Sequence, residues 1–311
     1  MDDFDVVVAG GGAAGLNAAL VLARARRRVA VIDAGDPRNA PAAHMQGFLS
    51  RDGMAPARLL EEGRAEVAGY GAEIVAERAE RIEAGFAVHL ASGRTLHARR
   101  VLVATGLRDE LPDVPGLRER WARDVLHCPY CHGYEVRDRP LGILGTPHLG
   151  LLLPQWSADV VFFPHRTELS ADERERLLAR GVHIADGEVA GLVVDGDALR
   201  GVELADGRVV PREVLFVGPR FVPRDDLLAG LGCATGEDGW VRTDPTGRTS
   251  VPGVWAAGNV VDPRAQAVTA AGMGSAAAIA LNADLVEEDV RRAVAAHRQV
   301  AGTLGAPASA G

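Results

Sequence analysis

The sequence predicts an α/β fold of two domains, each built on a strand–helix–strand unit. A chain of 311 residues exceeds the size at which one hydrophobic core usually keeps growing. Residues 6–9 form a short apolar run, followed by glycines, by an Ala/Leu-rich segment to about Arg26, and by a second apolar run at 29–32. The same order of strand, helix and strand returns more weakly at 141–144, 149–156 and 160–163.

Changes in composition divide the rest of the chain. Residues 101–104 are a further buried strand, and the Leu-Pro-Asp-Val-Pro-Gly segment at 111–116 is typical of a linker, which places the first domain border there. Residues 243–253 are rich in Gly, Pro and Thr. They precede a buried strand at 254–258 and an Ala-rich helix within 265–283, a block able to return to the first domain.

Charge and targeting signals narrow the class of protein. A formal net charge of -8 disfavours nucleic acid as a partner, because such binding needs clustered Lys and Arg. The N-terminal segment carries three aspartates and no basic region before its apolar run, so we expect a cytoplasmic protein. The long uncharged stretch 265–283 is mostly Ala and Gly, which indicates a close-packed helix and no membrane span.

The first strand–helix–strand unit contains a dinucleotide-binding pattern. Gly10, Gly12 and Gly15 form G-x-G-x-x-G between strand and helix, and Asp33 follows the second strand. In this pattern the glycines permit a tight turn, close approach of a pyrophosphate and close helix packing, while the acid accepts hydrogen bonds from a ribose. An acid at this position disfavours NADP and leaves FAD and NAD open.

The second unit carries a degraded copy of this pattern. Gly145, Pro147 and Gly150 fall where the first unit has its three glycines, and Pro164 falls where it has Asp33. A proline in the middle position crowds a pyrophosphate and removes an amide donor. His165 and Arg166 still offer charge to a phosphate. We therefore expect this domain to serve as scaffold and not to use a nicotinamide cofactor.

The Cys128-Pro129-Tyr130-Cys131-His132 segment is the predicted chemical centre. Two thiols separated by two residues can close a small disulfide, and a following helix would stabilise a thiolate. Zinc is the alternative, but a closed zinc site normally needs four ligands, and the third cysteine, Cys233, stands far away along the chain. We expect redox chemistry at the pair, no metal, and a buried apolar role for Cys233.

Three of the nine histidines are candidates for function. His132 directly follows the second cysteine, where an imidazole could move protons on and off the thiols. His127 directly precedes the first cysteine and is a weaker candidate. His44 lies in a loop after Asp33 that could border a bound flavin.

The sequence resembles the low-molecular-weight thioredoxin reductases and their relatives over nearly its whole length. The resemblance is carried by several motifs in the same order: V-V-A-G-G-G-A-A-G-L-N-A-A near the N-terminus, V-A-T-G at 103–106, the C-x-x-C, V-W-A-A-G-N-V-V-D at 254–262, and Q-A-V-T-A-A-G-M-G at 266–274. It implies two Rossmann-like dinucleotide-binding domains, the second inserted into the first, and a homodimer. Residues 1–112 and 241–311 would form an FAD-binding domain, and residues 113–240 a nicotinamide-type domain that carries the C-x-x-C.

The resemblance also implies roles for single residues. Cys131 would lie against the flavin, and Cys128 would exchange with the substrate. The expected FAD-binding residues lie in the shared motifs, in Asp33 and its neighbour, and in the following loop: Gly10, Gly12, Ala14, Gly15, Asp33, Ala34, His44, Thr105, Gly106, Gly258, Asn259, Gln266 and Ala267.

Three departures from the reductases resemble a narrower branch. His132 replaces an aspartate, Gly258-Asn259 replaces Gly-Asp, and the nicotinamide motif is broken. These features are similar to those of dithiol oxidases that close disulfides in natural products such as gliotoxin and holomycin. The resemblance implies oxidation of a small dithiol with dioxygen as acceptor. An NAD(P)H-dependent disulfide reductase, a redox-sensing protein and a ferredoxin-linked enzyme are the alternatives.

Overall fold

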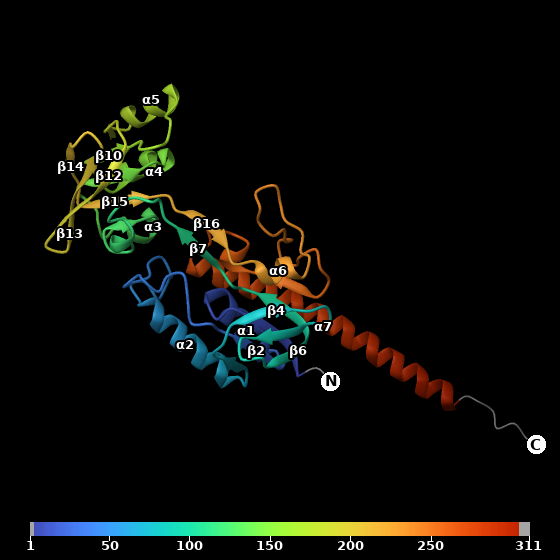
Figure 1. The fold of residues 1–311 in the computed structure, drawn as a ribbon. Helices are drawn as coiled ribbons and strands as arrows, with labels where there is room; N and C mark the ends of the chain where they lie inside the picture. The colour runs from blue at the N-terminus through green and yellow to red at the C-terminus, as the bar shows by residue number, and fades with distance from the viewer. Residues whose placement is uncertain (1–2, 305–311) are drawn as a thin grey trace, which may run out of the picture. The chain divides into compact units, whose positions relative to one another are not determined.

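The computed structural model describes residues 3–304, which divide into two compact units. Within the described residues, the first unit comprises residues 3–37, 60–107 and 223–304, and the second comprises residues 38–59 and 108–222. Figure 1 shows that each unit combines a sheet with helices packed on it. The structure thus has the α/β fold that the sequence predicts.

The sheet of the first unit has a parallel region around the N-terminal strand. In spatial order the strands are β3-β2-β1-β6-β5-β4, and β17 pairs with β6. Strands β1, β2, β3 and β17 run parallel to their neighbours, whereas β4 and β5 form an antiparallel meander with β6. Their bounds are Phe4–Ala9 (β1), Val29–Ile32 (β2), Glu73–Val75 (β3), Ala79–Ile82 (β4), Ala87–Leu90 (β5), Thr95–Val103 (β6) and Val254–Ala256 (β17).

The continuous apolar run of β1 is explained by cores on both faces of this sheet. Val6 and Val8 pack on one face with helices α1 (Ala13–Arg24) and α7 (Ala267–Leu304). Val7 faces the other core, which includes residues of the β4–β5 meander and of helix α6 (Asp226–Gly230). Parallel strands buried on both faces need apolar residues at every position and not at alternate ones.

The sheet of the second unit repeats the parallel arrangement on a smaller scale. Its order is β11-β10-β9-β15-β8, with bounds His183–Ile184 (β11), Val160–Phe163 (β10), Leu141–Leu144 (β9), Val214–Val217 (β15) and Val125–Leu126 (β8). Helices α4 (Pro147–Leu152) and α5 (Ala171–Ala179) cover one face. The antiparallel strands β12 (Val189–Asp195), β13 (Ala198–Leu204) and β14 (Val209–Pro211) contribute to the core of the other face.

Local signals explain where several helices begin. Ser170 caps α5 through a capping box, in which its hydroxyl accepts a bond from the Glu173 amide and the Glu173 carboxylate accepts one from the Ser170 amide. Helix α2 (Pro56–Gly69) begins at a proline, as α4 does. Proline suits the first turn of a helix because its missing N–H has no intrahelical partner there.

The borders of the two units differ from the predicted domain borders at three places. The second unit resumes at Arg108, whereas the predicted border lies at residue 113. Residues 38–59 belong to the second unit, although the prediction keeps them in the first domain. The chain returns to the first unit at Pro223 and not at residue 241. The early return has a physical reason, because Leu227 and Leu228 of α6 are buried in the core beneath β4 and β5. Strands β7 (Leu107–Glu110) and β16 (Arg220–Pro223) pair with each other near two of the crossing points.

Helix α7 begins within the predicted Ala-rich segment and continues to Leu304. Across the described residues 3–304, no helix has both the length and the apolar composition needed to span a bilayer.

Candidate functional site

The glycine turn of the first unit is held by contacts that leave no room for side chains at its first and third glycines. Gly10 has φ +116°, and a Cβ there would lie 2.3 Å from the carbonyl oxygen of Ala104, which follows β6. A Cβ on Gly15 would lie 1.8 Å from the Gly10 carbonyl oxygen. Both positions therefore require glycine, as the motif predicts.

Gly12 differs from Gly10 and Gly15, because the space beside it, where a side chain would lie, is empty of protein atoms. A Cβ placed there would meet no protein atom within 4 Å. Gly12 is also the N-cap of α1, and no side chain caps the helix there. The first-turn amides of α1 thus face the open side of Gly12, which is the arrangement that receives a phosphate.

Asp33 follows β2 and makes two contacts that hold its carboxylate. Oδ1 accepts a hydrogen bond from the Gly35 amide at 3.0 Å, and Oδ2 forms an ion pair with Arg64 Nη1 at 3.0 Å. Arg64 lies on α2 and was not identified from the sequence, because it belongs to no motif and lies 31 residues away. The Asp33 carboxylate is held beside the glycine turn, since a Cβ on Gly11 would lie 2.3 Å from Asp33 Oδ2.

Gly258, a predicted position, and Gly274, which was not predicted, both pack against α1. Gly258 lies in the short helix η3 (Gly258–Val260) with φ +79°, and a Cβ there would lie 2.9 Å from the Ala14 Cβ. Gly274 was missed as a site residue, yet a Cβ on it would lie 2.0 Å from the Ala14 carbonyl oxygen. Asn17 also joins the two helices by donating to the Ala271 carbonyl at 2.6 Å. The close crossing of α1 and α7 brings the first and last motifs of the chain together.

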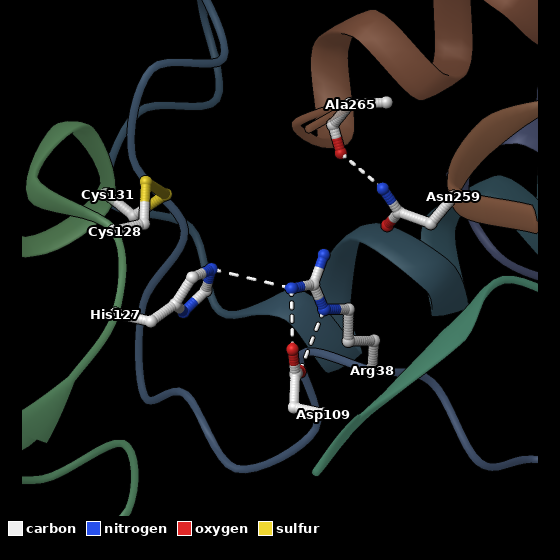
Figure 2. Close-up of a disulfide and its surroundings, with 7 residues drawn as sticks. All are labelled: Arg38, Asp109, His127, Cys128, Cys131, Asn259 and Ala265. Carbon is white, nitrogen blue, oxygen red and sulfur yellow. Dashed lines mark hydrogen bonds and ion pairs between the residues drawn. A yellow bond between two sulfur atoms is a disulfide. The ribbon is translucent and has the colours of Figure 1, made fainter. Parts of the chain in front are cut away.

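The remaining predicted cofactor residues of the first unit lie at the ends of strands and helices. Thr105 and Gly106 follow β6, where the Thr105 hydroxyl donates to the Arg224 carbonyl and the Gly106 carbonyl accepts from the Arg224 amide. Asn259 donates to the carbonyl of Asp262 at 2.9 Å and to the carbonyl of Ala265 at 2.9 Å, and Figure 2 shows the second of these bonds. These bonds fix the loop before α7. The others are the exposed Ala34, Gln266 just before α7, and Ala267, the first residue of α7.

His44 lies in the second unit, on the exposed part of the 38–59 segment. The structure thus places it in a different unit from the glycine turn. Its role beside a flavin stays a prediction.

The degraded motif of the second unit keeps the turn at its first glycine but has a proline in place of the middle one. Gly145 has φ +62°, which resembles Gly10 in sign. Pro147 is the first residue of α4, and the Thr146 hydroxyl fills the space beside Gly218, where a Cβ would lie 2.6 Å from it. The two candidate phosphate contacts are already engaged: His165 Nδ1 accepts from the Val189 amide at 3.0 Å, and Arg166 pairs with Glu188 at 2.7 Å.

Cys128 and Cys131 are joined in a disulfide in the second unit (Figure 2). Their Cα atoms are 5.2 Å apart, and the pair spans the first turn of the short helix α3 (Pro129–His132). Cys128 is the N-cap of this helix, and its carbonyl accepts bonds from the Cys131 and His132 amides. Both cysteines are half-buried, so one face of the disulfide reaches solvent. Cys233 is buried in the first unit, where burial raises the pKa of its thiol.

The two histidines that flank the pair have different surroundings. Burial lowers the pKa of His132, and the charge of Glu135 partly opposes this shift. Burial lowers the pKa of His127 further, to about 4, and the positive charge of Arg38 adds to the effect. Since both pKa values are lowered from the ordinary value of 6.5, both rings are neutral at neutral pH.

His127 lies in a cluster that the sequence did not reveal. Its ring stacks on Trp121 at 5.8 Å between centroids and meets the edge of Phe221 at 6.1 Å. Arg38 Nη2 lies 3.4 Å from His127 Nε2, and Arg38 is held by Asp109 through two bonds of 2.7 and 2.9 Å (Figure 2). We call Arg38, Asp109, Trp121, His127 and Phe221 the His127 cluster. All five belong to the second unit.

The low pKa of His127 predicts a loss of stability in mild acid. The folded-state pKa of about 4 lies below the ordinary value of 6.5, so the unfolded chain binds more protons between these pH values. The free energy of unfolding should fall by about 3 kcal/mol on this account as the pH drops through that window, and should be unaffected above it. Urea unfolding of the wild type and of His127→Phe at both ends of the window measures the effect. A difference between the two proteins that does not change with pH contradicts this prediction.

Comparison with known proteins agrees with this geometry. Residues 4–274 match the pyridine nucleotide-disulphide oxidoreductase family. The chain belongs to this family. It is 33% identical to thioredoxin reductase sirT of Leptosphaeria maculans over 92% of this chain and 96% of that protein. It is 30% identical to thioredoxin reductase aclD of Aspergillus oryzae, over 92% and 98%. The crystal structure of HlmI is 63% identical, with a TM-score of 0.93, over 95% of this chain and 97% of that one.

The chain is therefore a thioredoxin reductase-like, flavin-dependent redox enzyme with FAD as its cofactor. The residues of the first unit fit this group. The open side of Gly12 and the free amides of α1 suit a pyrophosphate, and the fixed Asp33 carboxylate suits a ribose.

Proposed function

We propose that this enzyme oxidises a small dithiol to a disulfide through Cys128, Cys131 and FAD, with dioxygen as the final acceptor. The observation that carries the proposal is the proline in the degraded dinucleotide motif of the second unit. Pro147 occupies the start of α4, where the first unit offers Gly12 and a free amide. Without an external hydride donor, the electrons must enter from the thiol side.

Thiol–disulfide exchange at the pair balances as follows. A substrate thiolate attacks Cys128 Sγ, a substrate–Cys128 bond forms, and the Cys128–Cys131 bond breaks to leave Cys131 as thiolate. The second substrate thiolate then attacks the substrate sulfur of this mixed disulfide and releases Cys128. The substrate has lost two electrons and two protons, and the enzyme disulfide has become a dithiol. The exchange role of Cys128 rests on the family pattern.

His132 is placed to take up a proton during this exchange, because it directly follows Cys131 and its lowered pKa keeps the ring neutral. Bound FAD supplies the two-electron acceptor that allows the pair to return to the disulfide, and dioxygen would then leave as hydrogen peroxide. The FAD-binding residues that we propose are the motif residues of the first unit described above, together with His44.

The class of substrate is proposed from the branch that the chain resembles. The C-x-x-C-H-G block at 128–133 is the one found in dithiol oxidases of the gliotoxin and holomycin type, and the 63% identity to HlmI supports the same branch. A natural product that carries two neighbouring thiols fits this chemistry. Its second thiol resolves the mixed disulfide without a protein partner.

The second candidate is a disulfide reductase that takes hydride from NADH or NADPH. It is favoured by the similarity to sirT and aclD, which are named thioredoxin reductases. The two functions predict opposite results in an anaerobic titration of the holoenzyme followed by the visible absorbance of the flavin. We expect dithiothreitol to bleach the flavin and NADPH to leave it oxidised. Rapid bleaching by NADH or NADPH would overturn the proposal.

The enzyme is further proposed to be a cytoplasmic homodimer. The support is an exposed stripe on α7, where Val286, Val290 and Val294 recur every four residues on one helix face. Analytical ultracentrifugation of the wild type and of a variant with all three valines replaced by serine tests the dimer. A monomeric wild type would contradict it.

A further inference from the structure

Three members of the His127 cluster lie where the chain passes between the two units. The chain crosses at 37/38, 59/60, 107/108 and 222/223. Arg38 is the first residue after the first crossing, and Asp109 and Phe221 lie within two residues of the last two. Their side chains meet at His127, the residue before Cys128. His127 therefore links the backbone beside Cys128 to three segments that lie next to these crossings.

The contact with Arg38 fixes the protonation of His127. A guanidinium donates hydrogen bonds and accepts none. The Nε2 atom that faces Arg38 Nη2 at 3.4 Å must therefore carry a lone pair, and a neutral ring then holds its proton on Nδ1. Asp109 keeps the guanidinium in this position through its two bonds, and the side chains of both residues are largely buried.

The aromatic contacts fix the orientation of the ring. Trp121 lies nearly parallel to it, at 24° between planes, and Phe221 meets it at 75°. Arg38 also lies over the Phe221 ring, 4.9 Å from its centroid. A ring held by an aromatic plane, an aromatic edge and a guanidinium has little freedom to rotate, and the adjoining backbone of Cys128 shares this constraint.

We propose that His127, held in place by Arg38 and by the rings of Trp121 and Phe221, is a positioning residue that fixes Cys128 for attack and takes no part in proton transfer. This inference rests on the proposed exchange at Cys128. In this proposal the two flanking histidines have different roles. His132 accepts a proton during the exchange, and His127 fixes the position of Cys128.

The charges around His127 agree with this division. Arg38 lowers its pKa, Asp109 raises it in part, and His132 acts weakly in the lowering direction. The other neighbours, Trp121 and Phe221, carry no charge. His132 instead faces Glu135, whose charge favours the protonated form. A ring that faces a fixed guanidinium is poorly suited to accept a proton, whereas His132 has no such neighbour among its described charges.

The test is a single turnover of the oxidised holoenzyme with dithiothreitol in the absence of oxygen. Samples are quenched with iodoacetamide, mass spectrometry counts alkylated Cys128 and Cys131, and the flavin absorbance of the same samples gives the electrons that have passed on to FAD. We expect His127→Ala to slow the exchange about tenfold at every pH with an unchanged pH dependence, because misplacing a reacting atom costs rate without removing a proton carrier. His127→Phe, which keeps an aromatic ring, should restore most of the rate. His132→Asn should change the pH dependence itself.

Arg224→Met is the matched control for Arg38→Met, because Arg224 also forms an ion pair near a crossing, with Asp36. Arg38→Met should slow the exchange, and Arg224→Met should not. A His127→Ala variant with the wild-type rate, or one that loses a limb of the pH profile, would overturn the proposal. Near-UV circular dichroism of each variant reports whether the fold is retained.

A second measurement does not depend on the substrate. In protein labelled with 15N-histidine, we expect the His127 ring to stay neutral, with its proton on Nδ1, from about pH 5.5 to about pH 8. Titration of His127 near its ordinary pKa would overturn the proposal. If no dithiol reduces the wild-type pair, the proposed function fails, and this measurement still decides the state of His127.

Discussion

Replacing Cys128 by serine is expected to lower the rate of dithiol oxidation by a factor of about a thousand or more, because loss of a nucleophile removes the whole covalent route. Replacing Cys131 by serine should be equally severe, since a lone thiol cannot form the internal disulfide that accepts the electrons. Oxygen consumption with dithiothreitol measures both losses. Cys233→Ser is the matched control, because this buried thiol contacts the Thr249 hydroxyl at 3.5 Å in the first unit.

The two variants should differ in what they trap. Cys131→Ser retains the exchange thiol, so incubation with 2-hydroxyethyl disulfide, a linear disulfide that releases mercaptoethanol, should leave a mixed disulfide on Cys128 that mass spectrometry detects. Cys128→Ser should trap less adduct, at Cys131. Equal trapping on both variants would contradict the assignment of Cys128 as the exchange thiol. Full activity of either variant would exclude the pair as the redox centre.

The first strand–helix–strand unit was predictable because its signals are local and agree with one another. The apolar run of β1 is flanked by a glycine that must adopt φ +116°, and the register of β1 on β2 pairs Val6 with Val29 and Ala9 with Ile32. A parallel strand buried on both faces has few other sequence solutions. The C-x-x-C was predictable for the same reason, since a disulfide across three residues depends only on the adjoining backbone.

The His127 cluster was not predictable, because it depends on distant parts of the chain. Arg38 lies 71 residues from Asp109 and 89 from His127, and none of them belongs to a recurring motif. Arg64 meets Asp33 only because α2 packs beside β2. Residues 38–59 carry no sequence signal that assigns them to the second unit. Long-range ion pairs follow from the fold and are not visible in any local pattern.

The degraded motif of the second unit is consistent with the proposed mechanism, in which this unit holds the disulfide and binds no nucleotide. The first unit has an open glycine turn at Gly12, whereas the second has Pro147 at the start of α4 and the Thr146 hydroxyl beside Gly218. The crossing segments, in turn, contact the residue before Cys128. The second unit therefore serves the proposed chemistry as the holder of the disulfide, without needing a second nucleotide.

Replacing Gly12 by alanine is expected to weaken FAD binding about tenfold or more while leaving the apoprotein folded, because the new methyl group meets cofactor and not protein. Its backbone is extended, at φ -81° and ψ -173°, which alanine adopts without strain. The protein itself should lose at most about 1 kcal/mol from poorer capping of α1. Flavin fluorescence quenching measures affinity, and urea unfolding of the apoprotein measures stability.

Gly15→Ala should show the opposite pattern, because its methyl group would meet the Gly10 carbonyl oxygen and destabilise the apoprotein itself. Gly69→Ala is the matched control, since Gly69 ends α2 and a Cβ there meets no atom within 4 Å. It should change neither affinity nor stability. If Gly12→Ala binds FAD as tightly as the wild type, the open side of Gly12 does not receive the pyrophosphate, and the assignment of the glycine turn as the phosphate site is wrong.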